Sequence, residues 1–204
     1  MDKMLNYLAK FISLIFHPLL MSSIGLLFIF NSGTYLSYLP LDTKRALFIL
    51  VFIGTFLIPI CFLPFYIYLK LIDDIKIESR IKRFYPLFVT GILYLITYLF
   101  LRNFPVPFIR LFLLSSTVCV FVNAFASTGL KISSHLIGTG GLVGLVAGLL
   151  IRLNADVTGL LIISILISGS VGYSRLQLKA HSPFEVYGGF VVGLFVVCGI
   201  LLIF

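Results

Sequence analysis

Residues 135–151 read HLIGTGGLVGLVAGLLI, a run that contains no Lys, Arg, Asp or Glu. As a helix this run would be roughly 26 Å long, slightly shorter than the ~30 Å hydrocarbon core of a bilayer. Gly140, Gly144 and Gly148 recur every four residues, so they share one face of that helix. Such a small-residue face lets membrane helices approach closely. The run therefore predicts a membrane span whose glycine face packs inside a helical bundle, and a homodimer through this face is the alternative.

Six further apolar runs share the chain with this one: 5–30, 46–71, 86–101, 109–126, 157–173 and 183–204. The chain is 60% hydrophobic and 11% charged, with a mean hydropathy of +1.17. A soluble domain of 204 residues could not bury that much apolar surface. The runs are continuous rather than alternating, which argues against a β-barrel. We expect an all-α, polytopic transmembrane bundle of six to seven spans, with 1–204 as a single integral membrane domain.

Prolines interrupt two of these runs. Pro18 follows His17 inside the run 5–30, and Pro59 and Pro64 lie inside the run 46–71. Proline removes a backbone donor and clashes with the preceding helical turn. Both runs are therefore predicted to be bent at these positions. For Pro18 the alternative is that it marks the point where an interfacial stretch turns into the bilayer.

The net charge of +8 comes from basic residues that cluster between the apolar runs. This pattern is typical of the flanks of membrane spans, which set topology and meet anionic lipid head groups. The expected partners are therefore membrane lipids and not nucleic acid.

Three polar strings separate the apolar runs: the first polar string is 73–86, the second is 131–135 and the third is 174–185. Two predicted spans lie between the first string and the second, and two between the second and the third. An even number of crossings returns a chain to the same side of a membrane. All three strings are therefore predicted to face one side and to be able to form one site.

The third polar string contains a histidine and a carboxylate on one helical face. His181 and Glu185 are four residues apart. The carboxylate could fix the tautomer of the imidazole and leave its other nitrogen free to attack, and Arg175 offers a planar fork for phosphate oxygens. Ser182 and Pro183 also resemble a helix start in which Glu185 closes a capping box, and the two interpretations are compatible.

The second polar string places Ser133, Ser134 and His135 where a loop enters a helix. Backbone N–H groups at a helix N-terminus attract an anion, and serine hydroxyls add donors. The histidine could protonate a leaving oxygen. The alternative interpretation is an ordinary interfacial helix cap, and Lys131 is either a phosphate contact or a flanking charge.

The first polar string is the most charged part of the chain. Lys76 and Arg83 are seven residues apart and would share a helical face, as would Lys76 and Arg80. The alternative is a solvated loop, and this is the interpretation that we favour for Lys82.

The three strings together resemble the type-2 phosphatidic acid phosphatase superfamily, which includes membrane lipid phosphatases. Its motifs are K-x6-R-P, P-S-G-H and S-R-x5-H-x3-D. The third string matches as Ser174-Arg175-x5-His181-x3-Glu185, with Glu in place of Asp. The second matches in part as Ile132-Ser133-Ser134-His135. The first reads Lys76-x6-Arg83, and its proline is delayed to Pro86. The resemblance covers the motif-bearing core 76–204 and implies six spans with a phosphatidate-phosphatase-like core.

The resemblance also implies roles for these residues. His181 would be the nucleophile that forms a phosphohistidine, Glu185 would orient it, and His135 would be the general acid. The phosphate oxygens would be held by Lys76, Arg83, Ser133 and Arg175, with Ser134 at the same helix start. No metal or other cofactor would be needed, because fixed cations can neutralise a transferring phosphoryl group. The sequence also contains no carboxylate cluster typical of Mg²⁺ and no Cys/His spacing typical of zinc.

These observations predict a metal-independent membrane lipid phosphatase. Its substrate would be a lipid phosphate such as phosphatidate, phosphatidylglycerol phosphate, a polyprenyl diphosphate or a phosphorylated lipid A. The alternative is a non-catalytic lipid-phosphate-binding protein or a small membrane transporter, because paired histidines and arginines also occur along transport paths.

Two observations disagree on which side of the membrane the site faces. Ten basic residues lie on the side of the polar strings and five on the other side, which by the positive-inside rule would place the strings in the cytoplasm. Half of those ten are candidate ligands, and without them the two sides are equal. The resemblance implies the periplasmic face of a bacterial inner membrane, which is the orientation that we expect.

Overall fold

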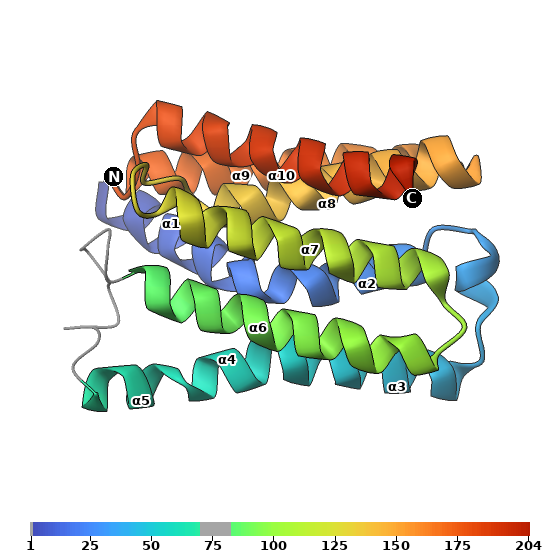
Figure 1. Cartoon of the computed structure of the whole chain (residues 1–204). Helices are drawn as coiled ribbons and strands as arrows, with labels where there is room; N and C mark the ends of the chain where they lie inside the picture. Colours follow the sequence, from blue (N-terminus) through green and yellow to red (C-terminus); the bar gives the residue numbers. More distant parts are fainter. Residues whose placement is uncertain (1, 70–82) are drawn as a thin grey trace.

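Helices dominate the computed structural model of the chain, which describes residues 2–69 and 83–204 (Figure 1). Within these residues there is no strand, and seven helical segments are long and apolar enough to cross a membrane. The prediction of an all-α, multi-pass membrane bundle is confirmed. The described part of the chain has seven candidate spans and not six.

The first span is broken where the sequence places His17 and Pro18. Helix α1 (Asp2–Ile15) ends before this pair, a 3-10 turn η1 (Pro18–Leu20) follows, and α2 (Met21–Phe30) completes the span. The Nδ1 atom of His17 accepts a hydrogen bond of 3.4 Å from the Leu19 N–H and so caps the 3-10 turn. The predicted bend at Pro18 is confirmed.

The second span follows the short turn η2 (Tyr35–Tyr38) and consists of several consecutive pieces. These pieces are α3 (Leu41–Phe52), the π-helical turn η3 (Ile53–Leu57), α4 (Ile58–Cys61) and α5 (Leu63–Tyr68). Pro59 lacks the N–H that would continue the regular α-helical hydrogen-bond pattern. The Ile58 N–H bonds to the Ile53 carbonyl, five residues back, as in a π-helix. The predicted irregularity at the prolines of this run is therefore present.

The remaining five spans agree with the predicted apolar runs to within a few residues. They are α6 (Phe84–Phe100) with the 3-10 turn η5 (Leu101–Asn103), α7 (Pro107–Ala126), α8 (Ser134–Leu153), α9 (Thr158–Gln177) and α10 (Pro183–Ile203). The left-handed Asn154 ends α8, a conformation that asparagine tolerates better than most residues.

Helix α8 lies at the centre of the bundle and packs most extensively against α10. The glycine face of α8 forms this contact. A Cβ atom on Gly144 would lie 2.6 Å from the Leu194 carbonyl oxygen, and one on Gly140 would overlap the Phe190 carbonyl. From the other side, Gly193 of α10 meets the Ile137 carbonyl equally closely. The glycine face is therefore used inside the bundle, and the homodimer stays a prediction.

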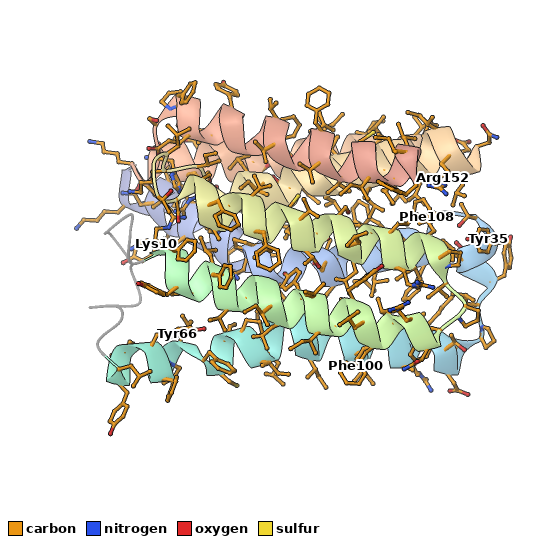
Figure 2. All side chains as sticks on the ribbon, in the orientation of Figure 1. Lys10, Tyr35, Tyr66, Phe100, Phe108 and Arg152 are labelled. Atoms are coloured by element: carbon orange, nitrogen blue, oxygen red, sulfur yellow. The ribbon has the colours of Figure 1, made fainter. Side chains whose placement is uncertain are left out.

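The outer surface of the bundle is apolar, as the surroundings of a membrane span require. Large side chains such as Phe100, Leu166 and Phe195 are more than half exposed. Charged side chains lie at the two ends, with Lys10 at one end and Arg152 at the other (Figure 2).

The described parts of the three polar strings lie at one end of the bundle. Helix α6 begins there, the chain turns there between α7 and α8 and between α9 and α10, and α1 also begins there (Figure 1). The parity prediction is confirmed for Arg83 and for the second and third strings. Lys76, Arg80 and Lys82 lie outside the described residues.

We expect the glycine contact between α8 and α10 to carry much of the stability of the bundle. Gly193→Ala should lower the free energy of unfolding by about 1–3 kcal/mol, the usual range for overpacking, because its Cβ would overlap the Ile137 carbonyl. Thermal unfolding of the purified protein in detergent measures this. Gly199→Ala on the same helix is the matched control, because a Cβ there meets nothing within 4 Å. Equal unfolding temperatures for the two variants would contradict the packing argument.

Candidate functional site

The third polar string forms a helix start in which a histidine and a carboxylate are bonded. Ser182 caps α10, and its hydroxyl accepts a hydrogen bond from the Glu185 N–H at 3.4 Å. The Oε2 atom of Glu185 accepts one from the Ser182 N–H at 3.2 Å and lies 2.9 Å from Nδ1 of His181. The Glu185 side chain thus completes the capping box and also bonds the imidazole, so its geometry fits both the structural and the orienting interpretation.

This hydrogen bond selects one tautomer of His181. When Nδ1 carries the proton and donates it to Glu185, Nε2 keeps its lone pair. The side chain of His181 is only 6% exposed. Burial lowers the pKa of His181 below its ordinary value of 6.5, and the positive charges of Arg175 and Arg83 lower it further, against the opposing effect of Glu185. The imidazole is therefore neutral at pH 7, the state that a nucleophile requires.

The second polar string is joined to the third through the backbone. The Ser133 N–H donates to the Glu185 carbonyl at 3.1 Å, so the starts of α8 and α10 are in direct contact. Ser133 occupies the N-cap position of α8 without a side-chain cap hydrogen bond, and it is completely buried. The structure therefore brings Ser133, His181 and Glu185 together as the sequence predicted.

Arg83 reaches the same place from the start of α6. Its Nη2 atom donates to the Ser134 hydroxyl at 3.1 Å, and Asn123 of α7 donates to the same oxygen at 2.8 Å. Burial lowers the pKa of Arg83, and the Glu185 charge raises it, but a guanidinium stays protonated at neutral pH. With two donors pointing at its oxygen, the Ser134 hydroxyl keeps its own hydrogen for an acceptor such as an anion.

Several buried polar atoms at this end lack a partner. Ser133 Oγ, Arg175 Nε and Ser13 Oγ are buried and make no hydrogen bond within the part of the chain that the structure describes. Four more such atoms occur elsewhere, in Ser23, Tyr66, Arg110 and Thr139. An unsatisfied buried donor costs roughly 1–3 kcal/mol. Two of these atoms, Ser133 Oγ and Arg175 Nε, belong to residues that the sequence predicts to hold phosphate.

His135 lies at the same end and is bonded to α1. Its Nε2 atom lies 3.1 Å from the carbonyl oxygen of Ser13, so Nε2 donates and Nδ1 is the nitrogen that is left for a substrate. The ring meets His17 edge-on, with 5.9 Å between ring centroids. The residue predicted as the general acid is therefore held in a single orientation by the first span.

Two residues of this cluster were not identified from the sequence. His17 was recognised only as part of a bend, although an ionisable group inside an apolar run is itself a signal of function. Asn123 lies among apolar residues in α7 and bonds Ser134, and an amide inside a span carries the same signal. Lys131 is half-buried and acts electrostatically on the Glu185 carboxylate. The predicted ligand Lys76 is not among the described residues.

The arrangement is a cluster of two arginines around a neutral imidazole, with serine hydroxyls nearby. Within 2–69 and 83–204, no group of three or more His, Cys, Asp or Glu side chains is placed to hold a metal ion. Comparisons with protein-family models, with curated proteins and with solved structures found no match to this chain. The resemblance to lipid phosphatases therefore depends on the three sequence motifs alone.

We expect the charges around His181 to be measurable by histidine NMR titration. The pKa of His181 should lie below 6.5. Glu185→Gln should lower it further, because the negative charge that favours the imidazolium is removed. Arg175→Gln should raise it, because a repelling positive charge is removed. Shifts in the same direction in both variants would contradict this electrostatic assignment, and Lys179→Asn, an exposed loop change, serves as the unshifted control.

Proposed function

We propose that the protein is a membrane lipid phosphatase that removes a terminal phosphate through a phosphohistidine intermediate. The observation that supports this most strongly is the hydrogen bond between His181 Nδ1 and Glu185, beside the positive charges of Arg83 and Arg175. It is the pairing that the S-R-x5-H-x3-D motif implies, and it leaves a neutral Nε2 beside two fixed cations.

In the proposed reaction the Nε2 lone pair of His181 attacks the phosphorus. A nitrogen–phosphorus bond forms as the bond from phosphorus to the lipid oxygen breaks. The anionic substrate favours a second proton on His135, so that Nε2–H stays bonded to the Ser13 carbonyl and the added proton lies on Nδ1. His135 gives this Nδ1 proton to the leaving oxygen and releases a lipid alcohol, or a shorter phosphate chain when the substrate is a diphosphate. His135 then accepts a proton from water as the water attacks the phosphohistidine, and inorganic phosphate leaves.

The cations stabilise charge rather than form bonds. Arg83 and Arg175 would neutralise the phosphoryl oxygens, and the hydroxyls of Ser133 and Ser134 would donate to them. The helix ends that carry these residues lie together at one end of the bundle (Figure 1). We assign this end to the membrane–water interface, where lipid head groups lie. We place the protein in a bacterial inner membrane with this end on the periplasmic side, as the resemblance implies.

The first test is phosphate release from a panel of phosphatidate, phosphatidylglycerol phosphate, polyprenyl diphosphate and lipid A phosphate. His181→Gln should reduce the rate by roughly a thousandfold or more, as expected for loss of a nucleophile, and should abolish trapping of labelled phosphohistidine. Lys179→Asn is the control, because Lys179 is exposed and has a positive φ that asparagine accepts. Binding of these lipids by the wild type without release or trapping would instead support the lipid-phosphate-binding protein.

The role of His135 has its own test. His135→Ala should slow release from an alkyl phosphate by about 10²–10⁴-fold, the usual contribution of a general acid. It should slow release from p-nitrophenyl phosphate much less, because that leaving group needs no proton. Equal losses on both substrates would show that His135 positions the site and does not donate the proton.

The pH dependence follows from the His181 pKa. The proposed nucleophile is active when neutral, so kcat/KM should fall as the pH drops through that pKa. Since the pKa of His181 lies below 6.5, the acid limb should also lie below 6.5, and it should move to higher pH in Arg175→Lys if the shorter reach of lysine weakens the repulsion. An acid limb above 6.5 in the wild type would be inconsistent with this assignment.

A further inference from the structure

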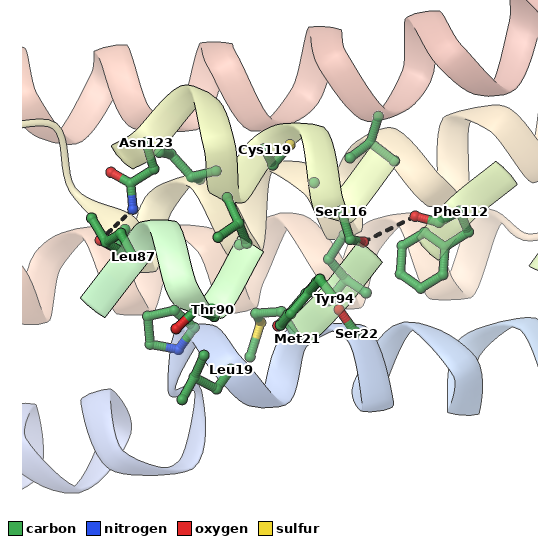
Figure 3. Close-up of a pocket in the computed structure, with 18 residues that line it drawn as sticks. Leu19, Met21, Ser22, Leu87, Thr90, Tyr94, Phe112, Ser116, Cys119 and Asn123 are labelled. Atoms are coloured by element: carbon green, nitrogen blue, oxygen red, sulfur yellow. Dashed lines mark hydrogen bonds between the residues drawn. The ribbon is translucent and has the colours of Figure 1, made fainter. Parts of the chain in front are cut away.

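An apolar cavity extends from the candidate site into the middle of the bundle. Its volume is about 80 Å³, or about 600 Å³ when all the space between atoms, including the part open to solvent, is counted. It is bounded by η1, α2, α6, α7, α8 and α10 (Figure 3). One end includes Ser134 and Asn123, and the other includes Phe112. Phe112 and Asn123 are eleven residues apart on α7, so the cavity extends along about 16 Å of that helix.

The cavity and the cationic site share a residue. Ser134 lines the cavity, and its hydroxyl accepts the hydrogen bond from Arg83. A molecule with an anionic head at the cationic site and a hydrocarbon chain would therefore place the chain in the cavity without crossing a barrier of protein.

The walls suit a hydrocarbon chain and not a polar ligand. Most lining residues are apolar, among them Leu19, Leu87 and Val197. Two hydroxyls in the wall are bonded to carbonyls of their own helices, Thr90 to Pro86 at 2.7 Å and Ser116 to Phe112 at 3.0 Å. They are thus satisfied without a ligand, and the cavity offers few polar groups for recognition beyond the end at Ser134.

The broken first span forms one wall of the cavity. Pro18 and Leu19 of η1 and Met21 of α2 all line it, and Figure 3 shows Leu19 and Met21 on the opposite side from Ser116 and Cys119 of α7. The Cβ that a residue other than glycine would add at position 138 would lie 2.6 Å from Met21 Cγ. The distance between the first span and α8 at this wall of the cavity therefore depends on the break at Pro18 and on the absence of a side chain at Gly138.

From this geometry we infer that the cavity is a binding site for one hydrocarbon chain of the phosphorylated lipid, which enters with the phosphate at Arg83 and Ser134. This inference rests on the proposed function for the identity of the head group. The hydrocarbon chain would be bound inside the protein, so the affinity for the lipid would rise with the length of that chain until the cavity is full.

The test uses a series of butyl-, hexyl-, octyl- and decylphosphonate, non-hydrolysable phosphate analogues, with the wild-type protein in nanodiscs. Binding, measured by thermal shift and by titration calorimetry, should strengthen by up to roughly fourfold for each added methylene and then level off. Thr90→Phe, which fills the cavity from α6, should remove this dependence on length while butylphosphonate binding stays within about twofold. Ile92→Phe is the matched control, because Ile92 is on the same helix and is exposed.

Further arms separate the outcomes. Ser116→Leu fills the cavity from α7 and should act as Thr90→Phe does, so that misfolding of one variant does not decide the result. Alkyl alcohols of the same lengths should bind at least tenfold more weakly, and equal binding would show a nonspecific apolar void and overturn the inference. An unchanged length dependence in both filled variants would also overturn it. These binding assays need no turnover. Length-dependent binding without phosphate release from lipid substrates would therefore refute the proposed phosphatase activity but support the proposed binding site for the hydrocarbon chain.

Discussion

The close contact between α8 and α10 is the constraint on which the site depends. At Gly140, Gly144 and Gly193 one helix backbone lies directly against the other, with no side chain between them. The contact continues to the end of the bundle, where the Ser133 N–H reaches the Glu185 carbonyl at 3.1 Å. Even there a small residue is needed, because a Cβ on Gly189 would lie 2.7 Å from the Ser133 carbonyl oxygen. The glycines thus set the distance between the two polar strings that contain the histidines.

The parts of this fold that could be predicted are those that depend on local chemistry. The apolar runs, the bends at Pro18 and in the second span, and the placement of the strings at one end follow from hydropathy, proline geometry and the parity of crossings. The site was predictable where a side chain and its partner are close in sequence, as with His181 and Glu185. Which helices become neighbours depends on packing between distant segments, so the contacts of His135 with Ser13 and His17 could not be predicted. The cavity was missed for the same reason, since it arises from a gap between elements.

The serine at position 134, where the resembling motif has glycine, is part of a network. Its hydroxyl accepts from Arg83 and from Asn123, and these donors come from the starts or ends of two other helices. A glycine here would leave both donors without this acceptor, at a cost of roughly 1–3 kcal/mol for Asn123, which is buried. The serine also holds the Arg83 guanidinium close enough to His181 for its charge to lower the pKa of that imidazole. The Ser134 side chain therefore links the start of α8 to α6 and α7, a link that a glycine could not make.

The glutamate in place of aspartate has a physical reason of the same kind. Glu185 is the third residue after the Ser182 cap, the position from which a glutamate, with its longer side chain, reaches back to the cap N–H. A single oxygen, Oε2, accepts both that N–H at 3.2 Å and the His181 Nδ1 proton at 2.9 Å. The two bonds restrict the carboxylate to one rotamer, and the carboxylate in turn restricts the imidazole. The carboxylate that caps the start of α10 therefore also fixes the orientation of the histidine. An aspartate would be one methylene shorter, so reaching both donors from the same position would require a shift of the backbone.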